Sequence, residues 1–252
     1  MKEELFELLL SETNRSFEGW DFSYITDTGR MQSEPLSWCY TSEILGDLRK
    51  TTSLLDMGTG GGEYLAKLIP LPALTCATEG YAPNVPIAKN RLEPLHVQVY
   101  EVIDDEHLPL PSSHFEMIIN KHESFSPSEV NRILQPQGVF YTQQVGGLDM
   151  IQLNDALGAN AEHMYSTWNL ASACAQLEEA GFVIERSAEA FPYARFYDVG
   201  AIIYYLKAIL WQIPDFTVEK YRDPLEKFHQ TIQENGYIQF QSHRFFLQAR
   251  KK

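Results

Sequence analysis

The sequence predicts an α/β fold in which helices cover both faces of a largely parallel sheet. Short apolar runs typical of buried strands alternate with helical segments from residue 53 onward. The first run ends in a glycine-rich turn, as expected where a strand leads into a helix. Such alternation favours right-handed crossovers between parallel strands. The length of 252 residues suits one large domain.

Each expected element follows from its local pattern. Strands are predicted at residues 53–57, 74–78, 97–103, 115–120, 139–143, 182–190 and 243–249. Helices are predicted at residues 1–10, 37–50, 64–69, 86–93, 127–134, 170–180, 199–211 and 217–235. We therefore expect a single domain with three parts. These are an N-terminal helical and aromatic cap (1–50), a core (51–190 and 237–252) and a helical insertion (191–236) before the last strand.

Charge and cysteine content limit the possible environments and partners. The 20 basic and 34 acidic residues give a formal charge of −14, which disfavours a broad nucleic-acid surface but would hide a local basic groove. The three cysteines form no C-x-x-C pair, so neither a disulfide framework nor a metal site is expected. The acidic N-terminal segment does not resemble a signal peptide, and residues 199–211 are too few to span a bilayer. We expect a cytoplasmic protein without a membrane segment.

The glycine-rich turn at residues 56–62 excludes two familiar phosphate sites. The dinucleotide pattern G-x-G-x-x-G, started at Gly58, requires a glycine where this chain has Glu63. No Gly-Lys-Ser/Thr sequence follows, so the turn is not a P-loop. Asp56 would repel a pyrophosphate, whereas it suits a cationic ligand without phosphates. S-adenosylmethionine, which joins a sulfonium, an amino acid and an adenosine, is such a ligand.

Acidic residues follow the next two strands in step with Asp56. Glu79 lies 23 residues further on, at the end of the second predicted strand, where a carboxylate can accept both ribose hydroxyls. Asp104 and Asp105 follow the third strand, where a carboxylate can accept from the adenine amino group. Three acids at consecutive strand ends beside a glycine turn indicate a nucleoside-binding site.

These motifs together resemble the class I S-adenosylmethionine-dependent methyltransferases, most closely the type 11 methyltransferase domain. The matching segments are residues 55–62, 79–80, 104–111, 115–120 and 133–140, with Gln137 where the family usually has glycine. The resemblance implies a Rossmann-like, doubly wound, seven-stranded sheet with one antiparallel strand. It also implies S-adenosyl-L-methionine as cofactor and S-adenosyl-L-homocysteine as product. The cofactor-binding residues implied are Asp56, Gly58, Thr59, Gly60, Gly62, Glu79, Gly80, Asp104, Asp105 and Asn120.

The segment after the fourth strand is the candidate for acceptor chemistry. Methyl transfer from a sulfonium needs alignment and a dry site, and it needs a general base only when the acceptor arrives protonated. His122 is the candidate base, with Glu123 orienting it or binding a cationic substrate. Gln143 and Gln144, after the fifth strand, are candidate hydrogen-bonding groups at the rim.

We expect a small molecule as the methyl acceptor, because the chain is acidic and carries no recognisable nucleic-acid module. An RNA methyltransferase is the alternative within the same class, and it predicts a basic patch near Lys121 and Arg195. A non-catalytic module that retains S-adenosylmethionine or S-adenosylhomocysteine is the alternative from another class. Aminopropyl transfer is disfavoured, because the acidic polyamine site it requires is replaced by Lys121 and His122.

Overall fold

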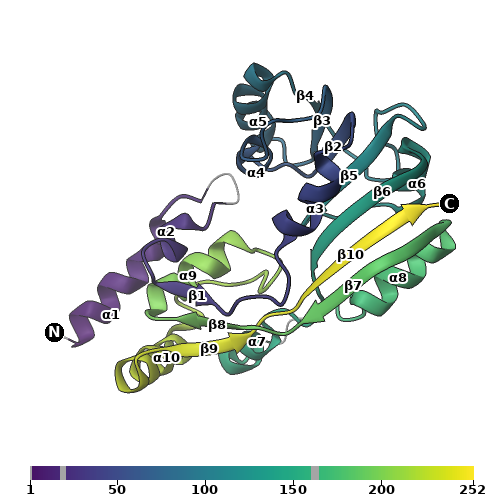
Figure 1. The fold of residues 1–252 in the computed structure, drawn as a ribbon. Coiled ribbons are helices and arrows are strands. Elements are labelled where there is room, and N and C mark those ends of the chain that lie inside the picture. Colours follow the sequence, from purple (N-terminus) through teal and green to yellow (C-terminus); the bar gives the residue numbers. More distant parts are fainter. Residues whose placement is uncertain (1, 18–20, 160–164) are drawn as a thin grey trace. The chain divides into compact units, whose positions relative to one another are not determined.

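The chain forms two compact units, each assembled from three separate segments (Figure 1). A computed structural model describes residues 2–17, 21–159 and 165–252. Unit 1 comprises Met1–Leu36, Gly147–Ser166 and Phe191–His243. Unit 2 comprises Ser37–Gly146, Thr167–Ala190 and Arg244–Lys252, and all its residues are described. Whether the two units unfold together as the single domain expected from the sequence stays a prediction.

Unit 2 contains a seven-stranded sheet in the order β4-β3-β2-β5-β6-β10-β7. Its strands are β2 (Ser53–Met57), β3 (Leu74–Glu79), β4 (Gln98–Glu101), β5 (Phe115–Lys121), β6 (Leu134–Val145), β7 (Phe182–Ala190) and β10 (Arg244–Lys251). Strand β10 lies between β6 and β7 and is antiparallel to both, whereas the other pairs are parallel (Figure 1). The predicted Rossmann-like sheet with one antiparallel strand is confirmed.

The helices of unit 2 follow the predicted alternation. They are α3 (Tyr40–Leu48), α4 (Glu63–Ala66), α5 (Asn84–Leu92), α6 (Pro127–Ile133) and α8 (Leu170–Glu179), with a 3₁₀ turn η2 (Glu93–Leu95) after α5. One helix and one strand have bounds that differ from those expected. Helix α4 ends earlier than expected, because the N–H groups of Lys67 and Leu68 donate to carbonyls three residues back and not four. Strand β6 begins at Leu134 rather than Val139, because the intervening turn is accommodated as an irregularity in the β5–β6 pairing.

Neighbouring residues of the central strands point to opposite faces of the sheet, and both faces are buried. On one face, the rings of Phe140 and Phe125 pack with their centroids 5.0 Å apart. On the other, the Tyr141 and Phe246 rings lie 6.3 Å apart, and the Tyr141 hydroxyl donates to Asp47 of α3 at 2.8 Å. This two-sided burial explains why the strands read as continuous apolar runs.

Unit 1 combines residues 1–36 of the predicted N-terminal cap and the predicted insertion with residues 147–166 and 237–243, which were expected in the core. Strand β1 pairs with β8, and β8 pairs with β9, so the sheet is antiparallel. The three strands, of three or four residues each, are too short to show an alternating pattern and were not predicted. The described elements of unit 1 are α1 (Lys2–Leu10), η1 (Ser11–Asn14), α2 (Ser23–Thr26), β1 (Met31–Ser33), α7 (Ile151–Leu157), β8 (Tyr193–Phe196), α9 (Val199–Ala208), α10 (Arg222–Asn235) and β9 (Ile238–Gln241).

Helix α9 is the most apolar segment of the chain, and its composition is explained by burial. All its residues except Lys207 are buried, and many belong to the hydrophobic core of unit 1. A helix that is apolar on every side is expected in the middle of a core. Across residues 2–17, 21–159 and 165–252, no helix combines the length and apolarity that a membrane crossing requires.

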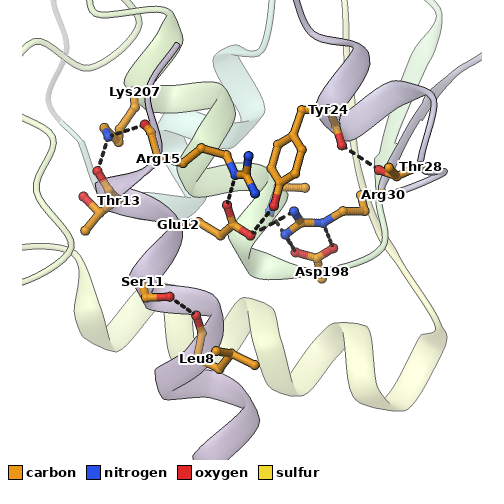
Figure 2. A network of polar contacts seen from close by, with 11 residues as sticks. Leu8, Ser11, Glu12, Thr13, Arg15, Tyr24, Thr28, Arg30, Asp198 and Lys207 are labelled. Carbon is orange, nitrogen blue, oxygen red and sulfur yellow. Dashed lines mark hydrogen bonds and ion pairs between the residues drawn. The ribbon is translucent and has the colours of Figure 1, made fainter.

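A polar network around Arg30 holds the N-terminal segment against α9 (Figure 2). The Arg30 guanidinium donates to both carboxylate oxygens of Asp198 at 2.7 Å and to Glu12 at 3.0 Å. Asp198 also accepts from the backbone N–H of Ala201 at 2.8 Å, which caps α9. The Tyr24 hydroxyl donates to Glu12 at 2.7 Å. One guanidinium thus links three segments that are distant in the sequence.

We expect Arg30→Gln to destabilise the protein by about 2–3 kcal/mol. The Arg30 and Asp198 side chains are mostly buried, so removing the cation leaves two carboxylates without their partner. The exposed pair between Lys220 and Asp215 provides the control, and Lys220→Gln should leave the stability nearly unchanged. Urea denaturation measures both variants, and equal midpoints would contradict the role assigned to Arg30.

Candidate active site

The glycine turn after β2 is fixed by hydrogen bonds to a neighbouring strand. Asp56 is only 4% exposed, and its Oδ2 accepts from the Thr59 hydroxyl at 2.8 Å. The Thr59 backbone N–H donates to the carbonyl of Thr78 at 2.9 Å, and the Gly58 N–H donates to the Thr78 hydroxyl at 3.3 Å. The end of β3 therefore sets the position of the turn.

Two glycines in this turn are required by both conformation and space. Gly58 and Gly62 have φ angles of 68° and 81°, in the left-handed region that favours glycine. A Cβ at Gly58 would lie 2.3 Å from Cγ of Glu123, and one at Gly62 would lie 2.7 Å from Cγ of Leu92. Gly58 thus lets the Glu123 side chain lie directly against the backbone of the turn.

Three carboxyl groups with raised pKa values gather at this end of the sheet. The pKa of Asp56 is raised to about 7, mainly by burial and also by the charge of Glu79, while the hydrogen bond from Thr59 and the charge of Lys121 lower it. Burial, with smaller effects of Glu79 and Asp105, raises the pKa of Glu123 to about 7. Glu79 is 3% exposed, and burial raises its pKa too. A cluster of such carboxyls disfavours the binding of an anion and stabilises a bound cation.

The two acids after β4 have different surroundings. Asp104 Oδ2 lies 2.7 Å from Nδ1 of His107, and its Oδ1 accepts from the Glu106 N–H at 2.8 Å. The hydrogen bond with His107 is the main reason why the pKa of Asp104 lies below its ordinary value. Asp105 instead accepts from the hydroxyl of Ser124, next to Glu123. Of these two acids, Asp105 therefore belongs to the cluster of carboxyls around Gly58.

Two exposed apolar side chains follow neighbouring strands of the site, and sequence reasoning missed both. Tyr81 is 55% exposed and donates its backbone N–H to Glu79 at 2.8 Å. Ile103 is 99% exposed, because β4 ends at Glu101 and not at residue 103 as expected. The position of each side chain directly after a strand end is the signal that could have found them. They supply apolar surface beside the acidic groups.

Asn120, at the end of β5, is fully buried and only partly hydrogen-bonded. Its Oδ1 accepts from the Thr142 hydroxyl at 2.8 Å and from Gln144 Nε2 at 2.7 Å. The Tyr40 hydroxyl donates to its backbone carbonyl at 2.9 Å. Its Nδ2 has no hydrogen-bond partner within the described chain. Gln144 is itself buried and holds Asn120 in place.

His122 is held by Gln143 through two contacts. The His122 backbone N–H donates to the Gln143 carbonyl at 2.8 Å, and the Nε2 atoms of the two side chains lie 3.0 Å apart. The indole of Trp38 donates to Gln143 Oε1 at 2.9 Å. Desolvation of the ring by the surrounding protein is the main reason why the pKa of His122 lies well below 6.5. The positive charges of Arg244 and Lys121 also lower this pKa. Gln143 therefore holds both the main chain and the ring of the predicted general base.

The structure brings most predicted residues to the carboxyl ends of β2, β3, β4 and β5, where ligands of such sheets bind. Arg195, which the RNA alternative pairs with Lys121, lies in unit 1 instead, where it contacts Gln239 and Glu34. Within the described residues, His, Cys, Asp and Glu side chains form no group of three that could hold a metal ion.

Comparison with known proteins finds similarity in solved structures only. No family model and no curated protein matches the sequence. A candidate methyltransferase of Bacillus halodurans C-125 is 17% identical with a TM-score of 0.57, covering 83% of this chain and 99% of its own. A protein of unknown function from Deinococcus radiodurans R1 is 15% identical with a TM-score of 0.58, covering 99% of this chain and 100% of its own. Phosphoethanolamine N-methyltransferase 2 of Haemonchus contortus, solved with S-adenosyl-L-methionine, is 14% identical with a TM-score of 0.51, covering 85% of this chain and 52% of its own.

The chain has the class I methyltransferase fold.

In this methyltransferase fold, the glycine turn and the acids at 79 and 105 follow three consecutive strands of the sheet order, β2, β3 and β4. Asn120, Lys121 and the segment that follows come from β5, on the other side of β2. The acids of β2–β4 and the segment after β5 therefore meet at the glycine turn, where Glu123 lies against Gly58.

We expect the free protein to lose stability as pH rises from about 4 to about 7. The pKa of Asp56 is about 7 in the folded state and 3.8 when unfolded, so the folded state binds more protons between these values. Asp56→Asn removes this loss, and the variant should gain roughly 4–8 °C in Tm relative to wild type between pH 5 and pH 8, for a difference of about 2 kcal/mol.

Thermal denaturation at both pH values measures the effect, with the exposed Glu179→Gln on α8 as control. Parallel pH profiles for wild type and Asp56→Asn would contradict the raised pKa.

Proposed function

We propose that this protein binds S-adenosyl-L-methionine and transfers its methyl group to a small-molecule acceptor. The observation that carries the proposal is the group of carboxyls around Gly58, formed by Asp56, Glu79 and Glu123. Buried carboxyls whose pKa values are raised to about 7 are ionised most readily beside a positive charge. A sulfonium with an α-ammonium group supplies that charge, whereas a pyrophosphate would be repelled.

The remaining groups suit the adenosine part of this cofactor. Glu79, at the end of β3, is assigned to the ribose hydroxyls, and Asp105 is assigned to the adenine amino group in preference to Asp104. Tyr81 and Ile103 offer exposed apolar surface for the faces of the base. Asn120 supports the proposal with a buried Nδ2 that lacks a partner among the described residues and can donate to the cofactor.

The chemistry proposed is an in-line displacement that depends on alignment. When bound, S-adenosylmethionine supplies a methyl group activated by the positive sulfur, and S-adenosylhomocysteine is the product. The carboxyls of Asp56 and Glu123 would bind the cationic part, and the rigid turn around Gly58 and Thr59 would orient it. Glu123 is assigned to cofactor binding here. The role of His122 as a base stays a prediction, although its Nε2 already contacts Gln143.

A small acceptor is favoured over RNA by the charge distribution. The formal charge is −14, and Arg195 is engaged by Glu34 in unit 1. The similar Haemonchus protein is named for phosphoethanolamine, a small molecule, and this supports the same class of acceptor without identifying it.

Calorimetry should detect binding of S-adenosylmethionine, and Glu79→Gln and Asp56→Asn should each weaken it about 10–100-fold. These losses correspond to one charge-assisted hydrogen bond or close charge contact of about 1.5–3 kcal/mol. Glu179→Gln on α8 is the control and should bind as wild type does. No binding by wild type, or equal binding by all four proteins, would contradict the proposal.

Methyl transfer is tested with radiolabelled S-adenosylmethionine and a cell extract divided by ultrafiltration into small molecules and macromolecules. We expect label in a product of the small-molecule fraction. Label only in RNA would support the RNA alternative. Tight cofactor binding with no labelled product in either fraction would support a non-catalytic binding module.

A further inference from the structure

The hydrogen bonds at Gln143 fix which of its atoms faces His122. The indole of Trp38 has a donor and no acceptor, so the Gln143 atom that it contacts at 2.9 Å is the amide oxygen. The amide nitrogen of Gln143 then faces His122 Nε2 at 3.0 Å. An amide nitrogen only donates, so His122 Nε2 accepts and carries no proton. In the neutral ring the proton therefore lies on Nδ1.

The backbone of His122 has an uncommon conformation. His122 has a φ of 63°, in the left-handed region, where non-glycine residues are uncommon and are often functional. Its backbone N–H donates to the carbonyl of Gln143 at 2.8 Å, so one residue anchors both the main chain and the side chain of His122. The side chain remains exposed, and within the described residues no group accepts from its Nδ1. Nδ1–H is available to a ligand.

Basic residues flank this ring on the same face of the sheet. Lys121 pairs with Gln143 across β5 and β6, and Arg244 pairs with Val145 across β6 and β10. Paired residues share a face, and residues two apart in a strand share a face. Lys121, Gln143 and Arg244 therefore project from one face near the end of β5. The low pKa of His122 agrees with two positive charges nearby.

Groups of opposite charge meet at the end of β5, where Lys121 also interacts with Asp56. Carboxyls surround the glycine turn of β2, and cations flank His122 at the end of β5. We propose that Trp38 and Gln143 hold His122 as its neutral Nδ1–H tautomer, and that this N–H binds an anionic oxygen of the methyl acceptor, a carboxylate or a phosphate. The identification of the anion as the methyl acceptor rests on the proposed methyl transfer, whereas the tautomer of His122 does not. His122 is then a hydrogen-bond donor to the acceptor and not its general base.

The tautomer is tested by long-range ¹H–¹⁵N correlation NMR of the ¹⁵N-labelled full-length protein, with His122 assigned from its absence in His122→Asn. We expect a protonated Nδ1 and an unprotonated Nε2 at pH 6.5, where an ordinary histidine is about half protonated. Gln143→Glu should reverse this pattern, because a carboxylate accepts from Nε2–H and raises the pKa of the ring. A protonated Nε2 in the wild type would overturn the proposal.

The anion is tested with sodium acetate as the carboxylate probe and inorganic phosphate as the phosphate probe, with sodium chloride at equal ionic strength as control. We expect one probe to shift the Nδ1–H signal saturably, and its identity selects between the two acceptor classes. Lys121→Gln should weaken this binding at least about 3-fold, as expected on losing a nearby charge. Equal responses to acetate, phosphate and chloride would overturn the anion site.

Two isosteric variants separate a donor from a base in the methyl-transfer assay. Asn and Asp both tolerate the left-handed backbone of His122, but only Asn offers an N–H near the position of Nδ1. We expect His122→Asn to keep activity within about 10-fold of wild type and His122→Asp to lose about 100-fold or more. The reverse order would identify a base. Should S-adenosylmethionine fail to bind, the proposed function fails while the NMR experiments still decide the tautomer.

Discussion

The site depends on the burial of one carboxyl group, Asp56, at the end of β2. Removing a carboxylate from water is costly, and one hydrogen bond from Thr59 offsets this cost only in part, so its pKa rises to about 7. The charge of Glu79 increases the cost, and Glu79 and Asp105 likewise raise the pKa of Glu123 beside the turn. A site that is unfavourable when empty and favourable with a cation present is consistent with ligand binding rather than with stability. The glycines around it allow this close approach, and Thr78 fixes the turn against β3.

The sequence predicted those features of the structure that depend on residues close together in the chain. The alternation of strands and helices predicted the sheet, and Asp56 and Glu79 were found because each lies at the end of an apolar strand. The contact of Glu123 with Gly58 could not be predicted, since it joins positions 65 residues apart in the sequence and depends on side-chain direction. The link from Trp38 to Gln143 spans 105 residues and was missed for the same reason. The sheet of unit 1 was missed because its strands are too short to show a period.

The groups assigned to the cofactor and to the acceptor are distributed differently along the chain. The acidic group lies on consecutive strand ends and leaves a pattern in the sequence. The groups assigned to the acceptor come from β5, β6, β10 and the segment before α3, and only the sheet register brings them to one face. Their chemistry is defined by hydrogen-bond direction, since an indole that can only donate determines the orientation of Gln143 and, through it, the tautomer of His122. Opposite charges on the two groups suit a cationic methyl donor and an anionic acceptor.

A site for a positive charge at Asp56 and its neighbours has a direct calorimetric test. Calorimetric titration at pH 7 in two buffers with different ionisation enthalpies measures the protons exchanged on binding. S-adenosylhomocysteine, which has the same amino group and no sulfonium, is the reference ligand. We expect S-adenosylmethionine to release more protons than S-adenosylhomocysteine, because the sulfonium lowers the pKa of carboxyls that are about half protonated at pH 7. Equal proton release by the two ligands, or no release by either, would contradict the account.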